Sequence, residues 1–299
     1  MRVHIELLDN EKVWDELLAS SPHATLFHNL TWLKVIGKYA RAELLPVVGY
    51  KGETPIGVYP LFYQRSMARC VLSPPQNLCP YLGPALADYD KLKEDKRLSI
   101  FSELQACVDN FIFSELKANY ASITLPAGFI DCRPLKWTGY QIKPAYYCLL
   151  DVAKFREGGI NRDKINVEEE KSEVLSHLHS LFGWKVPPGC LLELSSAFKQ
   201  NLKIFVARRE DEIIGGAVYV CYKNRVTKWL EGHKDPHVGD VLLHRVMMWA
   251  YEHGFEHYED ASPNYELIKG DCLKIRFTAE KYSSFVSRVM LRVMGTGWR

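Results

Sequence analysis

The spacing of apolar residues along the chain alternates between the two-residue period of strands and the three-to-four-residue period of helices. In the first half the pattern predicts these elements in order: a strand at 3–8, helices near 10–19 and 30–38, a β-hairpin around the turn 51–54, a long helix with Phe101, Leu104, Val108, Phe111, Ile112 and Leu116 on one stripe, and strands at 121–125, 140–142 and 146–151. This mixture of strands and helices predicts an α/β fold with a mixed sheet.

The second half begins with a polar stretch, residues 154–172, which contains Gly158-Gly159 and predicts a linker or a surface excursion. After it the pattern predicts a helix at 168–181, a helix following Pro187-Pro188, three successive strands within 201–233, a helix at 240–253, a strand at 255–261 and a final strand at 281–290.

Individual residues mark where elements begin and end. Asp9 or Asn10 is the expected N-cap of the first helix, and Gly254 is the expected end of the helix at 240–253. Pro60 cannot donate a hydrogen bond to a neighbouring strand, so it predicts an edge or a bulge within the second strand of the hairpin.

The two halves contain similar hairpins. When the sequence is shifted by 158 residues, GYKGETPIGVYPLFY (49–63) lies over ARREDEIIGGAVYVC (207–221) without a gap, and Ile56-Gly57 matches Ile214-Gly215. Both hairpins follow a helix and precede a long helix. Together these features predict an internal duplication.

The length of 299 residues suits about two domains at roughly 150 residues each. Each half carries one more basic than acidic side chain, and this balance argues against a nucleic acid as the main ligand. The eight cysteines are scattered among apolar residues without a C-x-x-C pair, which is typical of reduced thiols and predicts a cytoplasmic protein. Neither a signal peptide nor an apolar run long enough for a membrane span is recognised.

Several blocks of sequence resemble the FemAB-like group of tandem GNAT-fold proteins, which includes an acetyltransferase-like domain named after biotin-synthesis enzymes. The blocks are PHATLFHNLTWL (22–33), IGVYPLF (56–62), SPPQNLCPYLGP (73–84), DCRPLKWTGYQIKPAYYCLLD (131–151) and DASPNYELIKGDCLKIRFTAE (260–280). The resemblance implies two GNAT-like domains in tandem, a structural one at 1–152 and an active one at 153–299.

The resembling group includes acyl-CoA transferases and aminoacyl-tRNA-dependent peptidyl transferases. The resemblance therefore implies an N-acyltransferase that moves an acyl or aminoacyl group onto an amine. The alternative is a non-catalytic tandem scaffold that binds a metabolite or a protein. The expected co-substrate is acyl-CoA or another acyl carrier, with no tightly bound cofactor, and aminoacyl-tRNA stays possible as a donor.

One family feature is incomplete. GNAT enzymes that use acyl-CoA carry an R/Q-x-x-G-x-G/A turn, whose N–H groups hold the pyrophosphate at a helix start. Placed on Gly239, the sequence reads Pro236-His237-Val238-Gly239-Asp240-Val241 and meets one of the three consensus positions. Asp240 is an acid where an anion should bind, unless it serves as the helix N-cap. The sequence therefore predicts weak CoA binding or a different carrier.

An amine acceptor must lose a proton as it attacks, so a carboxylate is expected near the acyl carbon. Glu231 and Asp260 end neighbouring predicted strands, and with Tyr265, a possible acid for the leaving group, they are the candidate catalytic residues. A solvated strand end and a capped turn are the alternatives for these positions. The candidate substrate- or cofactor-binding residues are His233, Gly239, Ser262, Asn264, Lys274 and Arg276 of the second half, and Ser73, Tyr81 and His28 of the first.

A metal site is not expected. His253-Gly254-Phe255-Glu256-His257 spells H-x-x-E-H, but that zinc motif needs both histidines on one continuous helix. Because Gly254 is predicted to end the helix, the two histidines should lie on different elements.

Overall fold

The computed structural model describes residues 2–65, 68–75, 78–155, 165–183, 186–235, 237–261, 272–284 and 287–289. Its contacts divide the chain into two compact units. The first unit contains Met1–Ala145 and Ile275–Arg299, and the second contains Tyr146–Lys274. The sequence division after residue 152 differs from this one mainly at the C-terminus, because the last residues return to the first unit.

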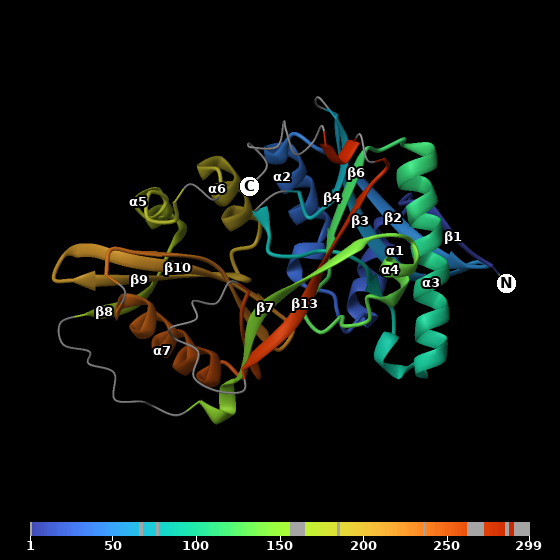
Figure 1. The fold of residues 1–299 in the computed structure, drawn as a ribbon. Coiled ribbons are helices and arrows are strands. Elements are labelled where there is room, and N and C mark those ends of the chain that lie inside the picture. The colour runs from blue at the N-terminus through green and yellow to red at the C-terminus, as the bar shows by residue number, and fades with distance from the viewer. Residues whose placement is uncertain are drawn as a thin grey trace. The chain divides into compact units, whose positions relative to one another are not determined.

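The first unit is built on strands β1 (Val3–Leu7), β2 (Glu43–Lys51), β3 (Thr54–Arg65), β4 (Arg69–Ser73), β6 (Tyr120–Thr124) and β13 (Leu273–Tyr282), which neighbour one another in this order (Figure 1). Short β5 (Ala85–Leu86) also pairs with β3. Neighbouring strands are antiparallel except for β4 and β6, which are parallel. The parallel pair requires a crossover, and α3 (Glu94–Asn110) supplies it.

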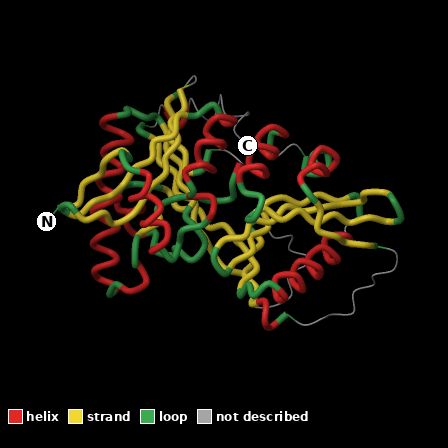
Figure 2. The backbone as a smooth tube through the Cα atoms, turned by 180° about the vertical axis from the view of Figure 1, so that it is seen from behind, coloured by secondary structure: helices red, strands yellow, loops and turns green. Residues whose placement is uncertain are grey.

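Helices cover both faces of these strands, as the tube in Figure 2 shows. On one face α3 packs Phe101, Leu104 and Val108 into a core with inward residues of β2 and β3. A π-helical turn, η4 (Phe111–Glu115), continues α3. On the other face lie α1 (Glu11–Ser20) and α2 (Leu30–Ala40), and Gly37 of α2 lies directly against the ring of Phe62.

The second unit has strands in the order β7 (Gln141–Asp151), β12 (His257–Asp260), β11 (Arg225–His233), β10 (Glu212–Tyr222), β9 (Leu202–Arg209) and β8 (Asn166–Glu170). Helix α7 (His237–Glu252) covers one face and forms a core with Ala217, Tyr219 and Tyr258. On the other face are α5 (Leu175–Leu178) and α6 (Pro188–Ala197), above the strands in Figure 1. Short helical turns complete the described elements: η1 (Leu26–His28), η3 (Tyr89–Lys91), α4 (Arg133–Trp137), η5 (Val152–Lys154) and η6 (Ser172–Val174).

The topology of the second unit repeats that of the first. The pairs β1–β2, β2–β3 and β3–β4 correspond to β8–β9, β9–β10 and β10–β11, all antiparallel, and the parallel pairs β4–β6 and β11–β12 follow. The hairpin registers also agree, since Gly49 pairs with Gly57 and, 158 residues later, Ala207 pairs with Gly215. The hairpin match found in the sequence is therefore a match of backbone pairing.

The last strand of each unit comes from the other part of the chain. β7 follows β6 in sequence but pairs with β12, whereas β13 follows β12 in sequence and pairs with β6. Both pairings are antiparallel, so each unit keeps the same strand order with an exchanged final strand. This exchange accounts for the return of the C-terminal residues to the first unit.

Several sequence predictions of elements are wrong in detail. The two strands expected at 140–142 and 146–151 are one strand, β7. The polar stretch 154–172 and the predicted helix at 168–181 contain strand β8, whose acidic residues pair with basic residues of β9, and only Leu175–Leu178 is α-helical. The final strand lies earlier than predicted, because β13 ends at Tyr282 and residues 287–289 are helical.

Other local predictions are confirmed. Asn10 caps α1 by accepting a hydrogen bond from the Lys12 amide at 3.0 Å, and Gly254 follows α7 with a φ of +74°. Pro60 is not at a bulge, but on the side facing away from β2 it has no strand partner, which makes it a local edge position. It lies between the residues of β3 that pair with β5 and those that pair with β4, and its carbonyl accepts a hydrogen bond from Ser73.

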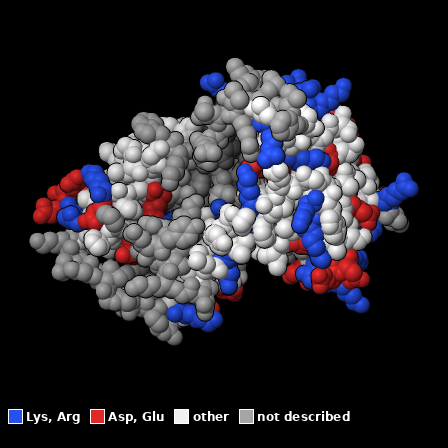
Figure 3. Space-filling view, in the orientation of Figure 1, with Lys and Arg blue, Asp and Glu red and all other residues white. Residues whose placement is uncertain are grey.

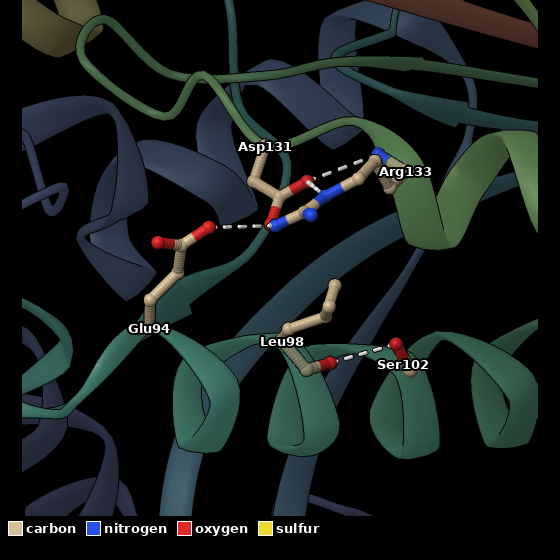
Figure 4. A network of polar contacts seen from close by, with 5 residues as sticks. All are labelled: Glu94, Leu98, Ser102, Asp131 and Arg133. Carbon is tan, nitrogen blue, oxygen red and sulfur yellow. Dashed lines mark hydrogen bonds and ion pairs between the residues drawn. The ribbon is translucent and has the colours of Figure 1, made fainter.

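Charged side chains join surface elements of the first unit. Arg133 at the start of α4 binds both carboxylate oxygens of Asp131 at 2.9 Å and reaches Glu94 of α3 at 3.4 Å (Figure 4). Both signs of charge occur on the face drawn in Figure 3, so this face is not a continuous basic surface. None of the described helices is long and apolar enough to cross a membrane.

Candidate functional site

Three charged side chains of the second unit meet where β11 and β12 end their pairing. The ammonium of Lys228 lies 2.6 Å from a carboxylate oxygen of Asp260 and also contacts Glu231. All three side chains are largely buried, with between 13% and 16% of each exposed. We call Lys228, Glu231 and Asp260 the Lys228 cluster.

Strand register brings the cluster together. β11 and β12 run parallel, and Lys228 pairs with Asp260 at the last position of their ladder. Glu231 is three residues beyond Lys228, a spacing that would put the two side chains on opposite faces of a regular strand. A bulge prevents this: β10 pairs Tyr219 with Lys228 and Val218 with Leu230, so Trp229 is the extra residue. Lys228, Glu231 and Asp260 therefore share one face.

The electrostatics of the cluster keep Lys228 charged. Burial lowers the pKa of Lys228, but the nearby charges of Asp260 and Glu231 outweigh this effect, and the pKa is raised overall. The cluster thus holds two carboxylates against one ammonium, with a net negative charge.

Two buried tyrosines lie beside the cluster. Tyr219 and Tyr258 are 1% and 2% exposed and belong to the core beneath α7. Burial raises the pKa of both phenols well above the usual range, and the charges of Glu231 and Asp260 raise it further. Both tyrosines therefore remain neutral, and their buried rings pack next to the carboxylates.

The start of α7 also lies against the cluster. A side-chain carbon at Gly239 would lie 2.9 Å from a carboxylate oxygen of Glu231 and 3.5 Å from the ring of His233. Glycine at this position therefore allows the Glu231 carboxylate to approach the first turn of the helix, where negative charge is favourable. Asp235 caps the helix by accepting a hydrogen bond from the His237 amide at 3.0 Å, so Asp240 is not the N-cap.

These residues do not fit the pyrophosphate of CoA at this helix start. The Glu231 carboxylate lies next to Gly239, and Asp240, in the first turn of α7, adds a further carboxylate to those of Glu231 and Asp260. Burial raises the pKa of Asp240, and the charge of Glu231 raises it further. Carboxylates thus stand where the family's phosphate-binding turn presents N–H groups to an anion. Of the turn quoted from the sequence, Pro236 lies outside the described residues.

The other predicted residues of the second unit have different positions. His233 ends β11, and its Nε2 is 3.8 Å from Oε1 of Glu231. Lys274 is exposed near the beginning of β13. Ser262, Asn264 and Tyr265 lie outside the described residues. The structure therefore brings together Glu231, His233, Gly239 and Asp260.

Ser73, Tyr81, His28 and Arg276 belong to the first unit and are buried there. The Ser73 hydroxyl donates to the Pro60 carbonyl at 2.7 Å and accepts from the Gly83 amide at 3.1 Å. The guanidinium of Arg276 lies over the Tyr81 ring, 5.7 Å from its centroid. His28 is completely buried, and its Nδ1 accepts from the Thr25 amide at 3.2 Å.

The two histidines of the H-x-x-E-H pattern lie on different elements, as the sequence predicts. His253 follows α7 and its Nδ1 lies 2.8 Å from the Trp249 carbonyl, whereas His257 begins β12. Within the described part of the chain, no group of three or more histidine, cysteine or acidic side chains is arranged to hold a metal ion.

Sequence reasoning missed Lys228. The residue was visible within RVTKWLEGH, but no sequence signal assigns it to the same face as Glu231, because the bulge at Trp229 is a feature of strand pairing. Asp235 was also missed as the acceptor for the His237 amide at the start of α7, although aspartate is a common residue at helix starts.

Comparison with known proteins finds a matching domain model within the second unit. Residues 168–264 match the family model of the acetyltransferase (GNAT) domain. This segment contains strands β9 to β12, helix α7 and all three residues of the Lys228 cluster. No curated protein matches the chain in sequence.

Three solved structures are similar over almost the whole chain. FemX has 11% identity and a TM-score of 0.63, covering 97% of this chain and 99% of its own. A tandem GNAT protein from the clavulanic acid biosynthesis pathway has 11% identity and a TM-score of 0.57, with 95% and 99% covered. The L-PGS of Bacillus licheniformis has 14% identity and a TM-score of 0.54, with 98% of each covered. These similarities confirm the predicted tandem GNAT fold.

Proposed function

We propose that the second unit transfers an acyl or aminoacyl group to an amine, with Glu231 as the general base. The observation that carries this proposal is the position of the Glu231 carboxylate, which lies against the first turn of α7 inside the segment that matches a GNAT domain. Asp260 is the second carboxylate of the same site, held through Lys228. The first unit is proposed to be structural.

The chemistry requires a proton acceptor close to the acceptor amine. As the amine nitrogen attacks the acyl carbon, it gives up a proton and the leaving group departs with the bonding electrons. Glu231 can take this proton directly or through water. Its Oε2 is held by Lys228, while Oε1 faces His233 and Gly239, so one oxygen is fixed and the other is turned toward the helix start.

The negative charge of the site favours particular substrates. A protonated amine is attracted to Glu231 and Asp260 before it loses its proton, whereas a pyrophosphate is repelled by Glu231 and Asp240. We therefore propose a cationic amine as acceptor, and a donor that carries its acyl group without a pyrophosphate at this helix start. Tyr265, Ser262 and Asn264 remain proposed contacts for the leaving group, with Lys274 and Arg276 as proposed anion contacts.

The test is a screen of acyl donors, including acyl-CoAs, acyl carrier proteins and aminoacyl-tRNA, with mixed amines as acceptors and product detection by mass spectrometry. Once a pair is found, Glu231→Gln should lower turnover by about 10²-fold or more, which is the usual contribution of a general base. Asp260→Asn should also lower it. Glu212→Gln is the matched control, because Glu212 is an exposed partner of Lys234 on the neighbouring strand. Full activity of both site variants would reject the assignment.

The second candidate is a non-catalytic scaffold. It is favoured by one observation, which is that Lys228 already pairs with both candidate carboxylates. In that case, no donor in the screen gives product, while a metabolite that binds the site still raises the melting temperature of the protein. A substrate pair with measurable turnover would reject the scaffold.

A further inference from the structure

His233 connects the largely buried Lys228 cluster with solvent. It ends β11, and 28% of its side chain is exposed, compared with 16% for Glu231 and 13% for Lys228 and for Asp260. Asp260 contacts Lys228, Lys228 contacts Glu231, and Glu231 lies 3.8 Å from His233. The contacts therefore lead from two buried side chains to an open end at the imidazole.

Two glycines leave room for the imidazole beside Glu231. His233 follows Glu231 by two residues beyond the bulge, so both side chains are on the same face of β11. On β10 the register partner of His233 is Gly215, where a side-chain carbon would lie 2.9 Å from the His233 Cβ. On α7 a side-chain carbon at Gly239 would lie 3.5 Å from the His233 Nε2. A larger residue at either position would displace the ring.

The two carboxylate oxygens of Glu231 have different neighbours. Oε2 is bound by the ammonium of Lys228, whereas Oε1 lies 3.8 Å from Nε2 of His233. A proton taken up by Glu231 is therefore expected on Oε1. The distance to Nε2 exceeds a direct hydrogen bond, but one water molecule can bridge it, and such distances often shorten when a substrate binds.

We infer that His233 takes the proton from Glu231 after each transfer and releases it to solvent, which restores the base. The inference rests on the proposed acyl transfer. The O–H bond at Oε1 breaks as an N–H bond forms at Nε2, and the other ring nitrogen gives its proton to water. Glu231 returns to the carboxylate form, and no electrons are exchanged.

The neighbouring charged groups make His233 the acceptor on the solvent side. Lys228 already carries three protons and cannot accept another. On α7, the charge of Asp240 interacts with the charges of His237, Glu231 and His233. Lys234, which follows His233 in sequence, pairs with Glu212 of β10 instead. Glu231 itself is largely buried, so direct loss of its proton to bulk water is hindered.

The experiment uses the full-length protein with a donor and acceptor pair from the screen described above. His233→Ala should lower kcat by about 10-fold or more without changing KM, because proton removal follows binding. Imidazole added to the buffer should restore turnover in proportion to its concentration. Pyrazole, which has the same size but is a much weaker base, should not restore it. This contrast separates proton transfer from the filling of space. His233→Gln should show the same loss in a variant that keeps the volume of the side chain.

His257→Ala is the matched control, because His257 Nε2 lies 3.9 Å from Glu256 in a more exposed pair of the same unit. It should keep the turnover of the wild type and show no response to imidazole. The inference alone is overturned if both His233 variants turn over like the wild type while Glu231→Gln is impaired, or if imidazole restores no more turnover than pyrazole. A wild-type protein without turnover in the screen, or a fully active Glu231→Gln, overturns the proposed function and this inference together.

Discussion

Replacement of Lys228 by methionine tests the organisation of the candidate site without any knowledge of the substrate. Methionine keeps most of the length of the side chain and removes only its charge and its hydrogen bonds. In the variant, Glu231 and Asp260 lose their shared counter-ion while remaining largely buried. The folded protein must then hold two carboxylates, one or both of which have to be protonated or hydrated.

The size of the effect follows from burial. Removing one partner of a buried ion pair costs about 3–5 kcal/mol, because the remaining charge is left without compensation. Since the three side chains keep 13–16% of their surface exposed, water can solvate them in part, and we expect a loss of about 3 kcal/mol in the free energy of unfolding.

The assay is urea unfolding of wild type and K228M at neutral pH, followed by tryptophan fluorescence. The matched control is K234M, since Lys234 pairs with Glu212 at 2.6 Å, the same distance as Lys228 to Asp260, but both side chains are more than half exposed. That variant should lose no more than about 1 kcal/mol. The triple variant K228M/E231Q/D260N should recover most of the stability, because it leaves no unpaired charge.

The result that would refute this reasoning is a K228M variant whose unfolding free energy equals that of K234M. Lys228 would then not be the counter-ion of Glu231 and Asp260 in solution. A triple variant as unstable as K228M would show instead that the lost stability comes from packing and not from charge.

Two further predictions concern each unit separately. Burial lowers the pKa of His28 to about 4 from 6.5, so the unfolded state binds a proton before the folded state does. The free energy of unfolding should therefore fall as the pH drops from 6.5 toward 4, by about 3 kcal/mol more in wild type than in H28N. Urea unfolding at a series of pH values measures this difference, and an equal pH dependence of the two proteins would contradict the prediction. Gly232→Ala should prevent the second unit from folding, because the added carbon would overlap the Leu181 carbonyl. Gly254→Ala adds a carbon into open space and should cost only about 1–2 kcal/mol of stability, through the positive φ of this residue. Circular dichroism spectra and thermal melts of the two variants measure this contrast.

Much of the fold was predictable because it is encoded locally. The hairpins are recognisable from alternating apolar residues around polar turns, and their shared Ile-Gly pair reflects a real constraint. A side-chain carbon at Gly57 would meet Leu86 at 2.6 Å, and one at Gly215 would meet Val238 at 2.6 Å. The same need for close approach at equivalent positions explains why the two hairpins share a register that is visible in the sequence.

The exchange of final strands was not predictable from local pattern. Apolar and polar residues alternate within 141–151 as in a strand, but this alternation does not determine which neighbouring strand it pairs with. β7 could satisfy its backbone hydrogen bonds beside β6 or beside β12, and it pairs with β12. Strand β8 was missed for a related reason. Its run Glu168–Glu170 looks helical or unstructured in sequence, and it is stabilised at the edge by Lys203 and Arg208 of β9.

At the candidate site, one bulged residue changes which side chains share a face of the sheet. Counting along β11, Lys228 and Glu231 differ by an odd number of residues, so simple alternation assigns them to opposite faces of the sheet. Under that assignment Glu231 and Asp260 would be two isolated strand-end charges. The bulge at Trp229 reverses the assignment for every residue beyond it, which is why Glu231 turns toward Asp260 and the start of α7. Because β-bulges are often found next to active sites, where they redirect a side chain, the bulge supports the proposal that Glu231 is the reactive carboxylate and that Lys228 positions it.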